Sequence, residues 1–179
     1  DGKGEDQYLS RVRQLTLEGR RSGEGYFSPD GKNIIFQSER EKGNPFYQIY
    51  TMSLETGDVL RVSPGTGKTT CAFFRPGSDE MLFASTHVDP ESVNKQKAEL
   101  DFRASGKTRR YSWDYDERMD IFSAGPEGKK LKRLTNALGY DAEGAYSPDG
   151  SKIVFCSIRD AYGREDFTDK EKVKLKYDI

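Results

Sequence analysis

The stretch SPGTGKTTC at residues 63–71 resembles part of a phosphate-binding loop. Such loops follow the pattern G-x-x-x-x-G-K-[ST], in which backbone N–H groups cradle phosphates, the Lys reaches the terminal phosphates and the hydroxyl holds Mg²⁺. Gly67, Lys68 and Thr69 match the last three positions, but Val62 stands where the first Gly is required. The following CAFFRPG indicates a short strand and a turn, whereas phosphate binding needs a helix N-terminus. We therefore expect a connecting loop here rather than an ATP site.

Few other residues could perform chemistry. His87 is the single histidine, and Cys71 and Cys156 have neither metal-ligand spacing nor a disulfide framework. His87 could act as a base or ligand, but we expect a hydrogen-bonded loop residue, and we expect both thiols to pack as small apolar groups. The sequence has no G-x-S-x-G elbow. We predict no catalytic set, no metal and no cofactor.

The composition limits the partners. Among 179 residues, 29 Lys and Arg balance 30 Asp and Glu, which gives a formal net charge of −1. This balance argues against nucleic acid or an anionic membrane as partner. No apolar run approaches the roughly 20 residues of a membrane span. We predict a protein partner, with the chain as a subunit of a larger assembly.

An internal repeat organises the chain. FSPDGKNIIFQS spans 27–38, FRPGSDEMLFAS spans 74–85 and YSPDGSKIVFCS spans 146–157. In the first copy, Pro29 presets the second turn position and Gly31 can adopt the left-handed conformation that closes a bulged hairpin. The middle copy lacks the S-P-D-G sequence, so its turn should differ. Four short strands per unit of roughly 40–50 residues are typical of a β-propeller blade.

These landmarks resemble the TolB-type β-propeller repeat family, a WD-like family with an S-P-D-G turn in each blade. The resemblance implies an all-β fold of four-stranded antiparallel blades, with about 2.5–3 blades present. The expected organisation is an N-terminal tail at 1–8 and a partial propeller at 9–179. Its blade units are expected at about 17–63, 64–135 and 136–179. Since a ring needs roughly four to eight blades, we expect part of a larger propeller of six or so blades, in which residues 8–16 supply an outer strand to the missing part.

Helical insertions are predicted at about 88–114 and 161–177. In the first, Asp89 is the expected N-cap and Pro90 the first helical residue, with Gly106 just past the end. Its apolar stripe is thin, so we expect the helix on the surface. In the second, Thr168 and Glu171 form the pattern of a capping box. Both insertions are expected on one rim, which suggests either a partner site or decoration without a partner.

Three inter-blade loops, TLEGRRSGE, SPGTGKTTC and TNALGYDAE, share the rim with these insertions. Aligned, they place Glu24, Cys71 and Glu143 in one column at the start of the innermost strand. Glu24 and Glu143 could bind a cation or a basic partner segment at the channel mouth. Alternatively, both could accept backbone N–H bonds that hold neighbouring blades in register.

The segment KTRRYSWDYDERMD at 107–120 mixes Arg and aromatic residues with acids. Arg and aromatic side chains are enriched in interaction hot spots, while a packed rim loop would have the same composition. The candidate partner-binding or ligand-binding residues are Glu24, Lys68, Arg109, Arg110, Trp113, Tyr140, Asp141 and Glu143.

The resemblance also suggests functions. The family includes a periplasmic protein-binding component of an envelope system and propeller domains attached to serine peptidases. We expect a non-catalytic protein-binding scaffold in a secreted or periplasmic assembly. The alternative is a substrate-gating propeller of a serine peptidase whose hydrolase domain lies outside this segment. A propeller enzyme or lectin that uses the channel mouth is a third possibility.

Overall fold

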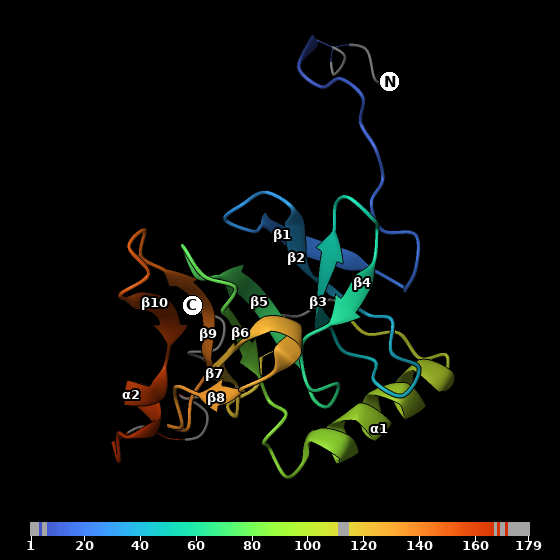
Figure 1. Cartoon of the computed structure of the whole chain (residues 1–179). Coiled ribbons are helices and arrows are strands. Elements are labelled where there is room, and N and C mark those ends of the chain that lie inside the picture. The colour runs from blue at the N-terminus through green and yellow to red at the C-terminus, as the bar shows by residue number, and fades with distance from the viewer. Residues whose placement is uncertain (1–3, 5–6, 111–114, 167, 169–170, 172–179) are drawn as a thin grey trace.

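A computed structural model describes residues 4, 7–110, 115–166, 168 and 171, and its strands form three antiparallel sheets (Figure 1). The first sheet contains β1 (Ser22–Phe27), β2 (Asn33–Ser38), β3 (Gln48–Ser53) and β4 (Val59–Arg61), in that order. The second contains β5 (Thr69–Phe74), β6 (Met81–Ser85), β7 (Asp120–Ala124) and β8 (Lys132–Arg133). The third pairs β9 (Asp141–Tyr146) with β10 (Ile153–Ser157). The all-β prediction and the four-stranded antiparallel sheets are therefore confirmed.

The S-P-D-G turn joins β1 to β2 through a small polar network. Ser28 donates its hydroxyl to Asp30 at 2.6 Å, and the amide of Asn33 donates to the Ser28 hydroxyl at 2.9 Å. Gly31 has a φ of +70° and donates its N–H to the carbonyl of Ser28 at 2.8 Å. The hydrogen bond from Ser28 is the main cause that lowers the pKa of Asp30. The turn between β9 and β10 repeats this arrangement, with Gly150 at a φ of +68°.

The middle turn differs, as its sequence predicts. Gly77, with a φ of +67°, occupies the third turn position, one residue earlier than Gly31 does in the first turn. A Pro followed by a left-handed Gly is typical of a type II turn. Arg75 replaces the capping Ser and donates to the carbonyl of Gly150 at 3.1 Å. The middle turn is thereby bonded to the turn of the third sheet.

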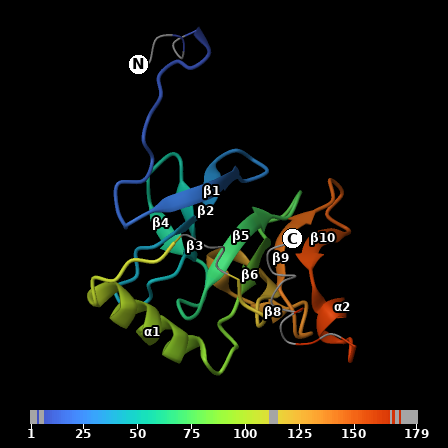
Figure 2. The same ribbon diagram turned by 180° about the vertical axis from the view of Figure 1, so that it is seen from behind.

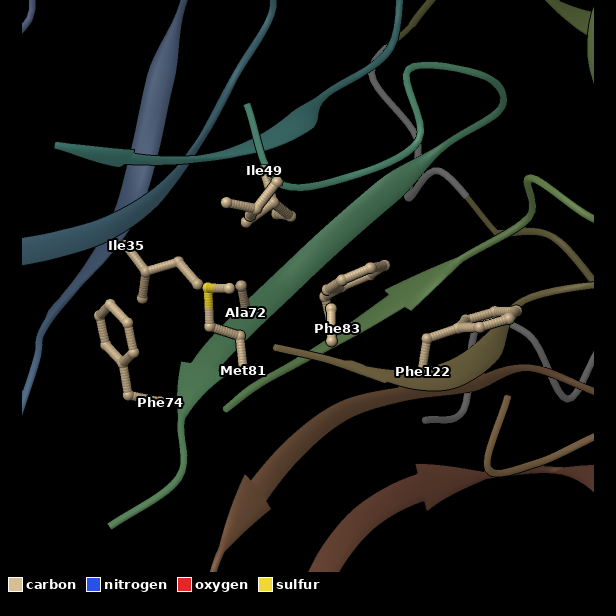
Figure 3. Packing of buried hydrophobic residues seen from close by; sticks show 9 residues of the cluster. Ile35, Ile49, Ala72, Phe74, Met81, Phe83 and Phe122 are labelled. Carbon is tan, nitrogen blue, oxygen red and sulfur yellow. The ribbon is translucent and has the colours of Figure 1, made fainter. Parts of the chain in front are cut away.

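The core lies between successive sheets, because the side chains along each strand of the second sheet point alternately to its two faces. On β6, Met81 and Phe83 pack toward the first sheet, while Leu82 and Ala84 pack toward the third. All five residues of β6 and all five of β7 are buried. The cluster between the first and second sheets (Figure 3) contains Ile35, Ile49, Val62, Ala72, Phe74, Met81, Phe83, Phe122 and Ala124.

A bulge recurs at the same place in the innermost strand of each sheet. Glu24, Cys71 and Glu143 have φ values of +48°, +53° and +56°. Each lies where the pairing register of its strand shifts. Because the left-handed region is costly for residues other than Gly, three occurrences in matching places indicate a shared backbone design rather than isolated strain. The three residues, which align with one another in the sequence repeat, thus occupy equivalent positions in the three sheets.

Helix α1 (Ser92–Ala104) lies within the insertion expected at 88–114 and, in both views, flanks the sheets (Figures 1 and 2). Its predicted start is wrong, because Glu91 is the N-cap and the helix begins at Ser92 rather than at Pro90. Asp89 instead accepts from the Glu91 amide at 3.1 Å and from Lys95 at 2.7 Å. Only Ser92 of this helix is buried, so α1 contributes little to the apolar core.

The ends of the chain add little regular structure. No strand occurs between residues 7 and 21. The first part of this segment extends away from the sheets (Figure 1), whereas Arg20 donates its N–H to the carbonyl of Glu39 at 2.8 Å. Near the C-terminus, α2 (Arg159–Tyr162) follows β10. Thr168 and Glu171 make the reciprocal hydrogen bonds of the expected capping box, at 2.8 Å and 3.3 Å. The rest of the expected helix up to residue 177 lies outside the described residues.

Candidate functional site

The Gly-rich loop before β5 is a connector between the first and second sheets. Its backbone donors are already used: Gly67 donates to the side-chain carbonyl of Gln96 at 2.7 Å, and Lys68 donates to the Thr86 hydroxyl at 2.9 Å. A strand rather than a helix follows. Since a phosphate-binding loop offers free N–H groups at a helix N-terminus, this loop is not built to cradle a nucleotide.

A cleft of about 750 Å³ opens beside this loop. Its walls come from the start of β1, from the loops that precede β3 and β5, and from the C-terminal half of α1 with residues 107–110. The lining residues are Arg20, Arg21, Glu24, Gln37, Phe46, Tyr47, Lys68, Thr69, Thr70, Glu99, Phe102, Arg103, Lys107, Thr108, Arg109, Arg110, Met119 and Tyr140.

A series of alternating charges joins the first sheet to α1 along the cleft. Arg21 and Arg103 both bind the carboxylate of Glu39, the latter at 3.2 Å. Arg103 also binds Glu99 at 2.7 Å, and Glu99 binds Arg109 at 2.6 Å. Although burial alone would raise the pKa of Glu99, the hydrogen bonds from the two arginines hold it below its ordinary value. We call these five residues the charge ladder.

The N-terminal half of α1 is attached by a second polar group. Lys95 binds Asp89 at 2.7 Å and Asp116 at 2.9 Å, and Lys68 lies 3.4 Å from the same Asp116 carboxylate. Burial opposes ionisation of Asp89, but the hydrogen bond from Lys95 brings the pKa of Asp89 below its ordinary value. Gln96 donates to the Gly43 carbonyl at 3.1 Å. Polar contacts therefore fix α1 along its length.

Aromatic rings in the cleft carry cations on their faces. The contacts are Arg21 over Tyr47 at 4.4 Å, Lys68 over Phe46 at 5.3 Å and Arg109 over Phe102 at 4.6 Å to the ring centroid. Such contacts stabilise a cation by about 0.5–1 kcal/mol at exposed sites. They hold the two guanidinium groups and the Lys68 ammonium in place, and each cation covers one face of its ring.

Three cations of the cleft remain available. Arg20, Lys107 and Arg110 are exposed, and among the described residues their side chains make no hydrogen bond or ion pair. Arg20 and Lys107 were not among the residues predicted from the sequence, although Lys107 lies two residues before Arg109, which was predicted. Their position in one cleft depends on the placement of α1, which local sequence does not reveal.

The structure brings five of the sequence candidates to this cleft. They are Glu24, Lys68, Arg109, Arg110 and Tyr140. Tyr140 is only 1% exposed and stacks on Tyr115 with ring centroids 5.5 Å apart, so it forms part of the floor.

The remaining candidates lie elsewhere. Asp141 is fully buried, accepts from the Ser157 hydroxyl at 2.5 Å and pairs with Arg159 at 2.5 Å, so its carboxylate stabilises the third sheet. Glu143 is exposed at the bulge of β9 and does not line the cleft. Trp113 lies outside the described residues.

The potential nucleophile and base are both poorly placed for catalysis. Burial raises the pKa of the Cys71 thiol to about 12, and the charges of Glu24 and Glu143 contribute to this increase. His87 contacts the Ser85 hydroxyl at 2.9 Å and packs 4.3 Å from the Phe122 ring, and burial lowers its pKa. Across the described residues, no group of three His, Cys, Asp or Glu side chains could hold a metal ion.

Comparisons with known proteins support the resemblance to TolB-type repeats. The chain is 26% identical over 158 residues to a TolB homologue of Chlorobium luteolum, covering 80% of this chain and 34% of the relative. It is 28% identical over 144 residues to YuxL of Bacillus subtilis, described as an uncharacterized peptidase, covering 76% of this chain and 22% of that protein. No family model matches the chain.

Solved structures give the same result. A putative TolB from Agrobacterium tumefaciens superposes with a TM-score of 0.55 at 21% identity, covering 80% of this chain and 40% of that one. TolB from Acinetobacter baumannii superposes with a TM-score of 0.50 at 26% identity, covering 73% of this chain and 25% of that one. The resemblance to the TolB-like propeller repeat family is thus confirmed. The chain spans about a third or less of the length of these curated relatives.

One further property concerns membranes. Within the parts of the chain that the structure describes, no helix has the length and apolar character needed to cross a bilayer.

Proposed function

We propose that this chain is a protein-binding module without catalytic activity, an accessory part of a periplasmic or secreted assembly. The single observation that carries this proposal is the cleft, whose walls combine repeat loops with an inserted helix fixed by charge pairs. Guanidinium groups and aromatic rings are the side chains most enriched in protein interaction hot spots. The similarity to TolB homologues favours a periplasmic location.

We also infer that the three sheets are consecutive blades of a larger propeller of six or so blades. Side chains at both outer sheets support this inference, since Phe27 is 68% exposed and Val154 is 70% exposed. A further blade on each side would cover these side chains. The unpaired residues 8–16 are suited to supply an outer strand to another blade. The unit boundaries at about 63 and 135 follow from the same interpretation.

Native mass spectrometry of the full-length protein, purified gently from its source, tests the proposed function. We expect a stable complex with at least one other protein. A monodisperse species with no other protein bound, under conditions where other envelope complexes survive, would contradict it.

The match to an uncharacterized peptidase favours one second candidate, a propeller that gates access to a serine hydrolase domain. In that case a fluorophosphonate reagent should label the full-length protein. Absence of labelling, together with absence of peptide hydrolysis, would exclude this candidate and leave the binding module.

A further inference from the structure

We propose that the cleft binds an extended acidic segment of a partner protein, whose Asp or Glu carboxylates pair with Arg20, Lys107 and Arg110. This inference rests on the proposed protein-binding function and specifies the chemistry of the partner. The three cations come from two separate segments, one preceding β1 and one following α1.

The first argument is the local charge. Seven of the 18 lining residues are Lys or Arg and two are Glu, whereas the whole chain has a net charge of −1. Four of the seven cations, Arg21, Lys68, Arg103 and Arg109, are already held by carboxylates of the protein. The other three have no such partner among the described residues. The cleft therefore carries positive charge that internal acids do not neutralise, and it attracts an anionic ligand.

The second argument separates a peptide from a nucleic acid. Single-stranded nucleic acids bind by stacking bases on aromatic faces. In this cleft the faces of Phe46, Tyr47 and Phe102 carry cations at 4.4–5.3 Å. The amides of Gly67 and Lys68, which could bind a phosphate, donate within the protein. Side-chain carboxylates need neither feature, because they pair directly with exposed guanidinium and ammonium groups.

The third argument is shape. A volume of about 750 Å³ lies within the range of clefts that enclose ligands of a few hundred daltons. One small anion would occupy only part of this space, whereas a segment of several residues could contact both basic segments. The charge ladder fixes the walls in advance, so that binding has to order mainly the side chains of Arg20, Lys107 and Arg110.

Fluorescence anisotropy with the full-length protein tests the proposal. The ligand is a labelled octapeptide of alternating Asp and Glu with one central Phe, and its counterpart carries Asn and Gln instead. In 50 mM NaCl we expect the acidic peptide to bind at least tenfold more tightly than the neutral one. Raising the salt to 500 mM should weaken acidic binding strongly, because exposed charges are screened.

Matched variants locate the site. The triple substitution Arg20→Gln, Lys107→Gln and Arg110→Gln should weaken acidic peptide binding at least tenfold. A control removes the same charge from exposed residues outside the cleft, by Lys32→Gln, Lys132→Gln and Lys152→Gln. The control should change binding less than twofold. All six residues are exposed, so both proteins should remain folded, which circular dichroism verifies.

Several results would overturn the proposal. These are equal affinity for the two peptides, equal loss in the two triple variants, or tighter binding of inorganic phosphate or of a single-stranded oligonucleotide than of the acidic peptide. If the wild type co-purifies with a partner protein and the cleft variant retains it, the cleft proposal fails while the binding-module function stands. If the wild type has no protein partner, the proposed function itself fails.

Discussion

The second sheet and helix α1 are held to the first sheet by opposite means. Apolar side chains fill the space between the two sheets, where Ile49 and Phe83 are completely buried. Helix α1 is attached almost entirely by charged and amide side chains, while Val93 is 62% exposed and Leu100 is 37% exposed. The apolar interface stabilises the repeat architecture. The polar attachment positions cations along a cleft, which points to the helix as the part that adapts a repeat fold to binding.

The largest effect should follow from removing the centre of the apolar interface. Phe83→Ala should lower the free energy of unfolding by about 3–5 kcal/mol, through lost burial and a residual cavity. Leu100→Ala on α1 should cost only about 1–2 kcal/mol, because its side chain is 37% exposed already. Urea denaturation of the full-length proteins measures both. Equal losses would contradict the contrast between the two regions.

A backbone change at the connector should have the next largest effect. At Gly67, with a φ of +70°, an added Cβ would lie 2.7 Å from the Thr86 hydroxyl oxygen. Gly67→Ala should therefore cost about 2–3 kcal/mol, from left-handed strain and steric overlap. Gly57 is the matched control, because its φ is +80° and nothing lies within 4 Å of an added Cβ. Gly57→Ala should cost about 1–2 kcal/mol, and a larger loss there than at Gly67 would be inconsistent with the packing described.

Breaking the charge ladder should act locally. Arg103→Met removes the bonds to Glu39 and Glu99 and should destabilise the attachment of α1 by about 1–2 kcal/mol. Hydrogen exchange should rise in α1 but not in β6. Lys97→Met is the control, since its pair with Asp101 is exposed to solvent and such surface pairs contribute little to stability. Faster exchange in β6 would show that the helix is part of the common core.

Acid should affect the two regions differently. The pKa values of Glu99 and Asp89 lie below their ordinary values of 4.5 and 3.8 because both are paired in the folded state. Their stabilising effect is complete above those ordinary values and is lost as the pH falls through the lowered ones. Hydrogen exchange, corrected for intrinsic rates, should therefore rise in α1 below about pH 4 before it rises in β6 and β7. If exchange rose at the same pH in α1, β6 and β7, the result would argue against an attachment of α1 that depends on ionised carboxylates.

Sequence patterns gave the repeat strands and the S-P-D-G turns, because each turn is encoded by contiguous residues such as Ser28 and Gly31. They also placed Glu24, Cys71 and Glu143 in one column, which the structure shows to be a shared bulge. The sequence patterns did not predict the start of α1 correctly. Asp89 is a residue type typical of an N-cap, but its side chain binds Lys95 instead. Local sequence patterns could not predict the cleft, because it depends on contacts between distant residues such as Arg103 and Glu39, which are 64 residues apart.

The central claim is that α1 and the repeat loops together form one binding cleft. Hydrogen exchange of the full-length protein, with and without the acidic octapeptide, tests it most directly. We predict that the peptide protects residues 20–24 and 99–110 and leaves β6 and β7 unchanged. Protection confined to other surfaces, or no protection at saturating peptide, would contradict the account.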